Sequence, residues 1–355
     1  MRHNSVLFFS RGRGRGHAVP DVAIAADLLK ADPHCEVLFA SYGTGAATIR
    51  ELGYAVIDLG LPEANTPWET IVRAAQLIQK EAPDVVVSHE ELWALPAAKI
   101  YARPTVYITD WFPADDDADC LAYADEIVFT DDRGYFDEPV AAAGKIHYTG
   151  QVFRFDPETL DKNSARRALG VPLDTKLILV IPGGSDISSE HQTPIAALVL
   201  DAFNRLSFPS KYLIWIAPEH DQELLLEKCG VRNDIRICKP HSDVHLTMIA
   251  ADVAITKGTR KTSFELAALG VPSISLSHGR NPIDDRRVGH IPTNRAVRVA
   301  ALDGEYLSEL LDRAFRMNIA GLPPAALVKG RAAILDRLLA NLEKVRRLGS
   351  EQRQQ

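Results

Sequence analysis

The chain has 355 residues, 46% of them hydrophobic and 25% charged, with a formal net charge of −7. This length exceeds the size at which one hydrophobic core usually stops growing, so two domains are expected. The acidic balance excludes a general nucleic-acid binder, because affinity for a phosphate backbone requires a basic surface.

The cysteines and the apolar runs indicate the cellular compartment of the protein. Four cysteines (Cys35, Cys120, Cys229, Cys238) lack C-x-x-C spacing, which argues against a zinc knuckle or a disulfide framework. No stretch approaches the roughly 18 apolar residues of a membrane span, and early arginines interrupt anything resembling a signal peptide. We expect a cytoplasmic protein with free thiols and no transmembrane segment; peripheral membrane contact stays open.

Short apolar runs alternate with helical patterns through the first half of the chain. Such alternation predicts βαβ units and a parallel sheet that is buried on both faces. The expected strands are SVLFFS, EVLFAS, YAVIDL, DVVVSH, PTVYIT, EIVFT and IHYTG, and the expected helices cover 21–30, 46–52 and 67–80.

The pattern restarts after a polar stretch near residues 151–163. Strands are expected at KLILVIPGGS, KYLIWIAP, DIRICKP, ADVAIT and PSISLS, with helices at 165–169, 194–206 and 263–269. Apolar residues at helical spacing from Ile334 to Val345 predict a final helix that packs on a domain. The fold class is therefore α/β, with two Rossmann-like domains (1–154 and 160–325) facing a cleft and a C-terminal helix and tail (326–355).

The first Gly-rich loop, SRGRGRGHAVPD, follows the first predicted strand. Gly12 and Gly14 begin a dinucleotide fingerprint, but His17 stands at its third glycine and the next strand ends without an acidic residue. A Walker phosphate loop is also excluded, because no Gly-Lys-Ser/Thr follows. The glycines instead let the chain turn at the end of a strand and present His17 near a helix N-terminus.

The order of these motifs resembles the glycosyltransferases of the GT-B fold, and most closely their MurG-like branch (the family 28 type). The resemblance rests on G-x-G-x-G-H-x-x-P from Gly12 to Pro20, then APDVVVSHE, YTGQVFR, VIPGGSD and ADVAITKGTRKTSFELAALGVPSISLS. It implies sugar transfer from a nucleotide diphosphate donor, with UDP as the expected nucleotide, to an acceptor hydroxyl. Inversion and independence of a metal are further implications.

The second domain is expected to hold the donor. Thr262 and Glu265 stand where a helix begins, so its N–H groups and the Thr262 hydroxyl suit a diphosphate, while Glu265 can accept from two ribose hydroxyls. Thr262-x-x-Glu265 is also a capping box, which is the structural alternative. The remaining donor-binding candidates are Gly183, Gly184, Ser185, Gly258, Thr259, Asp284 and Asp285.

Two details depart from the family's pattern. Gly258 lies seven residues before Glu265, whereas the family's glycine lies six before its glutamate. Asp284 and Asp285 stand where relatives carry an amide that contacts the donor sugar, and carboxylates accept hydrogen bonds but cannot donate them. The identity of the donor sugar is therefore left open.

The first domain is expected to bind the acceptor, with Gly14 and Gly16 shaping its loop. His17 has a side chain whose usual pKa suits a general base at neutral pH. Asp110, at the end of a predicted strand, is expected to orient His17 or to act as the base itself. A histidine after a Gly-rich turn is otherwise a capping or loop residue.

No cofactor and no metal are expected, and the acidic stretch PADDDADC, Pro113 to Cys120, is interpreted as a solvated loop. The sequence does not identify the acceptor, for which a small molecule, a lipid and a glycan are the alternatives. Three alternatives remain open, namely a nucleotide-sugar hydrolase, an epimerase of the same fold, and a non-catalytic nucleotide-sugar binder.

Overall fold

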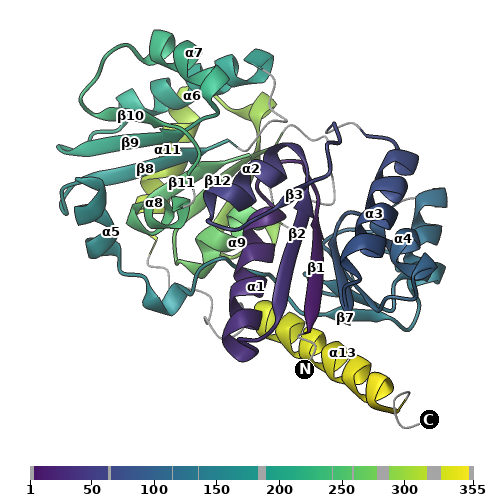
Figure 1. Ribbon diagram of the computed structural model, residues 1–355. Coiled ribbons are helices and arrows are strands. Elements are labelled where there is room, and N and C mark those ends of the chain that lie inside the picture. Colours follow the sequence, from purple (N-terminus) through teal and green to yellow (C-terminus); the bar gives the residue numbers. More distant parts are fainter. Residues whose placement is uncertain are drawn as a thin grey trace. The chain divides into compact units, whose positions relative to one another are not determined.

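The computed structural model describes residues 4–62, 65–113, 115–134, 136–182, 189–241, 243–257, 260–277, 288–317 and 329–351. The chain forms two compact units: Met1–Arg154 with Ala325–Gln355, and Phe155–Pro324. Each unit has a parallel sheet with helices against it (Figure 1). The predicted fold class, α/β with two Rossmann-like domains, is confirmed at the level of the individual domains.

The first unit is built on a seven-stranded parallel sheet in the order β3-β2-β1-β4-β5-β6-β7. The order reverses between β1 and β4, and ligands of open α/β sheets bind at such a reversal, outside the carboxyl ends of the strands. The strands are β1 (Ser5–Ser10), β2 (Glu36–Ser41), β3 (Ile57–Asp58), β4 (Val85–His89), β5 (Thr105–Thr109), β6 (Glu126–Phe129) and β7 (Ile146–Tyr148).

Helices cover both faces of this sheet because its strands are apolar on both sides. The C-terminal helix packs with α1 on one face, where Ile334, Leu338 and Leu342 join a core that contains Ile24 and Leu28. On the other face, α3 and α4 pack over Leu7 and Phe9 of β1. The helices are α1 (Ala18–Ala31), α2 (Gly43–Glu51), α3 (Pro67–Glu81), α4 (Ala94–Ile100) and α13 (Lys329–Glu351), with short 3-10 helices at Asp115–Tyr123 and Val140–Ala142.

The second unit has a six-stranded parallel sheet in the order β10-β9-β8-β11-β12-β13, which reverses between β8 and β11. Its strands are β8 (Lys176–Ile181), β9 (Lys211–Ile216), β10 (Ile235–Cys238), β11 (Val253–Thr256), β12 (Ser273–Ser277) and β13 (Asn294–Arg298). Its helices are α5 (Lys162–Leu169), α6 (Ser189–Arg205), α7 (Glu219–Cys229), α8 (Val244–Ala250), α9 (Arg260–Ala268) and α11 (Gly304–Phe315), with 3-10 turns at Pro157–Thr159 and Val299–Ala301.

Two further observations bear on the expected setting of the protein. All four cysteines are unpaired. Within the described part of the chain, none of the helices combines the length and the apolar character that crossing a membrane requires.

Candidate functional site

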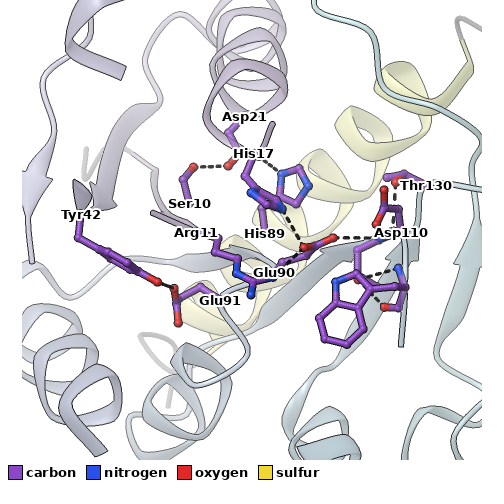
Figure 2. Close-up of polar contacts among 12 residues, drawn as sticks. Ser10, Arg11, His17, Asp21, Tyr42, His89, Glu90, Glu91, Asp110 and Thr130 are labelled. Carbon is purple, nitrogen blue, oxygen red and sulfur yellow. Dashed lines mark hydrogen bonds and ion pairs between the residues drawn. The ribbon is translucent and has the colours of Figure 1, made fainter. Parts of the chain in front are cut away.

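Polar side chains gather where β1, β4 and β5 end in the first unit (Figure 2). Arg11 directly follows β1, Glu90 follows β4, and Asp110 follows β5. Backbone hydrogen bonds continue the sheet to this point: Arg11 N donates to His89 O (3.2 Å), and Glu90 N donates to Ile108 O (3.0 Å). Residues that are distant in sequence therefore meet at the reversal of the strand order.

The glycines of the first loop have different roles. A Cβ on Gly12 would lie 2.2 Å from Cδ2 of Tyr42, so only glycine fits there. Gly14 has φ +64, a backbone conformation that favours glycine. A Cβ on Gly16 would meet no atom within 4 Å, so the loop has room at that position.

His17 stands at the N-cap of α1, but its side chain makes no capping hydrogen bond. Its Nε2 lies 2.7 Å from Oε2 of Glu90. Its Nδ1 is buried and has no hydrogen-bond partner among the described residues. The capping role that sequence left open is thus excluded, and the histidine faces the edge of the sheet.

Glu90 is the centre of the cluster. Its side chain is 5% exposed, and its carboxylate is near His17, Arg11 Nη1 (3.3 Å) and the N–H of Asp110 (3.4 Å). Its backbone has φ +54, which is uncommon for a residue with a side chain and costs of order 1–3 kcal/mol. The surrounding contacts therefore hold this carboxylate in place against backbone strain.

A second histidine–carboxylate pair lies beside the first. His89 Nδ1 is 2.7 Å from Oδ1 of Asp21, which is fully buried, and the other oxygen of Asp21 accepts a hydrogen bond from Ser10 Oγ. The rings of His89 and His17 meet edge to face, with centroids 4.9 Å apart. One nitrogen of each ring and one oxygen of Glu90 lie within 4.8 Å of one another.

Glu91 belongs to a different contact. Its Oε2 accepts a hydrogen bond from Tyr42 Oη at 2.9 Å. Burial raises the pKa of Glu91, and burial together with the charge of Glu91 raises the pKa of Tyr42 to about 12. Tyr42 therefore stays protonated and donates to Glu91 at neutral pH.

Asp110, expected to orient His17 or to act as the base, lies directly after β5, and the carboxylate 2.7 Å from His17 Nε2 is that of Glu90. Asp110 contributes its backbone N–H to the Glu90 carboxylate. The signal for Glu90 was in the sequence, since SHEEL places carboxylates directly after a buried strand, but nothing local distinguishes Glu90 from Glu91.

In the second unit, α9 follows β11 at the reversal of the strand order. The helix begins at Arg260, so Thr262 lies inside its first turn and not at an N-cap, and the capping-box alternative does not fit. Thr262 and Glu265 are both half-buried. The fully buried Ser263 approaches Ser275 Oγ of β12 at 3.4 Å, which ties α9 to the sheet.

The other predicted donor residues lie outside the described part of the chain. They are Gly183, Gly184, Ser185, Gly258, Thr259, Asp284 and Asp285.

The arrangement in the first unit suits proton transfer. In a neutral imidazole one nitrogen is a donor and the other an acceptor, and the hydrogen bond of one decides which is which. With Glu90 accepting the proton of Nε2, the lone pair of His17 lies on Nδ1. This is the arrangement that carboxylate–histidine pairs use to hold a general base.

Comparisons with known proteins agree with the resemblance. No protein-family model matches the chain. Over 76% of its length it is 26% identical to the UDP-N-acetylglucosamine–N-acetylmuramyl-(pentapeptide) pyrophosphoryl-undecaprenol N-acetylglucosamine transferase of Acetivibrio thermocellus, of which 77% is covered.

Solved structures share the fold of the whole chain. A putative UDP-N-acetylglucosamine 2-epimerase from Listeria monocytogenes matches with a TM-score of 0.72 at 16% identity, covering 97% of this chain and 98% of that one. The MurG of Acinetobacter baumannii matches with a TM-score of 0.60 at 14% identity, covering 96% and 99%. The GT-B fold is thus confirmed, together with the similarity in sequence to the MurG-type transferases.

Proposed function

We infer that this chain, a homologue of the MurG-type N-acetylglucosaminyltransferases, is a glycosyltransferase that moves a sugar from a nucleotide diphosphate to an acceptor hydroxyl. The sequence relative of Acetivibrio thermocellus is named as a transferase of this kind. The observation that carries the proposal is the His17–Glu90 pair, at 2.7 Å, at the point of the sheet where ligands bind.

His17 acts as the general base in this proposal. Glu90 accepts the Nε2 proton, so Nδ1 takes the proton of the acceptor hydroxyl as the hydroxyl oxygen attacks the anomeric carbon and the bond to the diphosphate breaks. Because Nδ1 is buried, the acceptor must displace the groups that cover it. Glu90 also stabilises the imidazolium that forms. Arg11 and the N–H of Asp110 hold the Glu90 carboxylate toward the ring.

The second unit holds the donor in the same proposal. The N-terminus of α9 faces the diphosphate, Thr262 adds a hydroxyl donor, and Glu265 accepts from the ribose. Gly183, Gly184, Ser185, Gly258 and Thr259 complete the phosphate contacts, and Asp284 and Asp285 accept from hydroxyls of the sugar. Donors aimed at the departing diphosphate stabilise the charge that develops there, commonly by several kcal/mol.

The donor is proposed to be a UDP-sugar, transferred with inversion, without a metal and in the cytoplasm. Two carboxylates in place of an amide favour a sugar other than N-acetylglucosamine. The free thiols are in keeping with a reducing compartment.

The fold does not decide between transferase and epimerase, because solved structures of both kinds match the chain. The sequence similarity favours the transferase. An epimerase converts the sugar while it stays linked to UDP, or releases UDP without any acceptor, whereas a transferase releases UDP only when an acceptor is present.

Two measurements test the proposal. A thermal-shift screen of nucleotide sugars first identifies the donor, because a ligand that binds only the folded state raises the apparent stability. Release of UDP is then followed with and without acceptors, namely simple glycans, alcohols and the lipid-linked acceptor of the relatives. Release that depends on an acceptor supports the transferase, and release into water alone or epimerised donor contradicts it.

A further inference from the structure

We propose that His17, His89 and Glu90 form a binding site for a divalent transition-metal ion such as Zn²⁺, and that the ion inhibits the enzyme by capturing its base. One nitrogen of each histidine and one oxygen of Glu90 lie within 4.8 Å of one another, and His89 and Glu90 are buried. Imidazole and carboxylate are ligands that Zn²⁺ accepts in four-coordinate sites. The inhibitory part rests on the proposed function; the binding part does not.

The contact between His89 and Asp21 is a second observation that supports the metal site. Metal-bound histidines almost always donate their other ring N–H to a carboxylate, a backbone carbonyl or a water, which fixes the ring and its tautomer. His89 Nδ1 lies 2.7 Å from the fully buried Asp21, so in the proposed site His89 binds the metal through Nε2. The edge-to-face contact turns the His89 ring toward His17 (Figure 2).

The geometry needs small shifts only. A tetrahedral ion with bonds of about 2.0–2.1 Å places its ligand atoms about 3.4 Å apart. The His17 Nε2 and Glu90 Oε2 atoms are 2.7 Å apart and would separate slightly, while the third ligand atom moves closer from within 4.8 Å. A water or a substrate oxygen completes the four ligands.

The ion stops catalysis through the tautomer of His17. A metal on Nε2 displaces the proton that Glu90 accepts, and in the neutral ring this proton moves to Nδ1. Nδ1 then carries a hydrogen and has no lone pair to accept the proton of the acceptor hydroxyl. The ring loses no proton overall, but the base is lost.

Arg11 opposes the metal. Its Nη1 lies 3.3 Å from Glu90 Oε2, so a fixed cation stands beside the expected ion. Removing this charge is therefore expected to tighten the binding of Zn²⁺, whereas adventitious binding at surface residues does not respond to Arg11.

The binding test uses the full chain, stripped of metal with a chelator, and calorimetric titration with Zn²⁺. We expect one ion per chain. His89→Asn keeps a side-chain N–H for Asp21 but removes the nitrogen that binds the metal. Loss of a hydrogen-bond partner of a metal ligand alone lowers metal affinity 10–100-fold, so loss of the ligand itself is expected to lower the affinity for Zn²⁺ by about 100-fold or more. His34→Asn, an exposed position outside the cluster, is the matched control and is expected to bind like the wild type.

Arg11→Gln is expected to change the affinity for Zn²⁺ in the opposite direction, by tightening it. This variant tests the proposal if His89→Asn does not fold. The proposal is overturned if Zn²⁺ does not saturate at one per chain, or if neither variant changes the affinity in the expected direction. In turnover assays, Zn²⁺ is expected to inhibit the wild type reversibly, and the residual activity of His89→Asn is expected to resist the same concentration. If Zn²⁺ binds the site but turnover is unchanged, the proposed inhibition is wrong. If the metal-free enzyme does not release UDP in response to an acceptor, the proposed function is wrong, and the binding of Zn²⁺ is unaffected by that result.

Discussion

Glu90 combines a buried carboxylate with a strained backbone. Its φ of +54 would suit glycine better, yet a glutamate here reaches His17, Arg11 and the N–H of Asp110. Strain of this kind persists only when surrounding contacts fix it, and such residues are concentrated at functional sites. The cost in stability is therefore consistent with selection for the position of the carboxylate.

Glu90→Gln is expected to lower kcat by about 10²-fold or more. The glutamine amide donates to Nε2, which moves the ring proton of His17 to Nδ1 and removes the lone pair; the wrong tautomer in a catalytic triad costs about 10⁴-fold. Steady-state kinetics with saturating donor measure the change. Glu91→Gln still accepts from Tyr42 and is the control, with an expected change of less than about tenfold. Equal losses in both variants would argue against a specific role for Glu90.

His17 could be selected from the sequence because the three glycines just before it mark a turn at the end of a strand. Glu90 could not, because its contact with His17 spans 73 residues and depends on which strands are neighbours. Local sequence does not contain that order. The contact between His89 and Asp21 spans 68 residues and was missed for the same reason.

At the scale of single elements, α3 shows how its sequence defines its ends. Thr66 accepts from the N–H of Glu69, whose side chain accepts from the N–H of Thr66, and Pro67 opens the helix. The helix ends at Glu81, and its C-cap residue Ala82 has φ +47. An alanine in this left-handed conformation costs about 1–2 kcal/mol, which glycine does not pay.

Ala82→Gly is expected to raise the free energy of unfolding by about 0.5–1 kcal/mol, because relief of the left-handed strain exceeds the entropy that glycine adds to the unfolded chain. Ala75→Gly, inside the same helix, is the control and is expected to lower it by about 1 kcal/mol. Urea denaturation measures both. Changes of the same sign would contradict the assignment of strain to Ala82.

Most strands of the two sheets follow from their short apolar runs, and helical spacing predicted α1, α2, α3, α5, α6, α9 and α13. The helices α4, α7, α8 and α11 and the strand β13 were not predicted. β13, NRAVR, has only two apolar residues, Ala296 and Val297, in a partly exposed edge strand, so its hydrophobic pattern is weak. α4 contains a proline and only seven residues, and packing against α3 stabilises what its own sequence does not specify.

At the scale of the whole molecule, Asp252 joins several parts of the second unit. Its carboxylate contacts Lys162 and Arg166 of α5, each at 2.6 Å, and accepts from the N–H of Leu177 in β8. Burial acts to raise its pKa, but the bond to Lys162, the Leu177 N–H and the charges of Lys162 and Arg166 outweigh it and lower the pKa below the usual 3.8. The carboxylate therefore stabilises the folded unit when ionised.

Asp252→Asn is expected to destabilise the second unit by about 3 kcal/mol at pH 7, because the buried Arg166 loses its charge partner. The contribution of a carboxylate with a lowered pKa is present above the unfolded value of 3.8 and is lost as the pH falls through the folded value. Hydrogen exchange of β8 and β11 amides in urea is expected to show the difference at pH 7 and a smaller one near pH 3. A constant difference across this range would contradict the role of the charge.

The donor is expected to bind the second unit. Glu265→Ala should weaken UDP by more than about 1 kcal/mol, the value of a charge-assisted hydrogen bond, in isothermal titration. Glu305→Ala removes a carboxylate from the first turn of α11 in the same unit and is the control, with unchanged affinity expected. Equal UDP affinity in all three proteins would exclude a ribose contact at Glu265.

The separation of base and donor between the two units is tested most directly in His17→Ala. UDP release in the presence of acceptor and UDP affinity are measured on the same protein. Because general-base catalysis contributes about 10²–10⁴ in rate, turnover is expected to fall at least about 10²-fold while the Kd for UDP changes little. Near-normal turnover would contradict His17 as the base, and loss of UDP binding would place the nucleotide at the first Gly-rich loop.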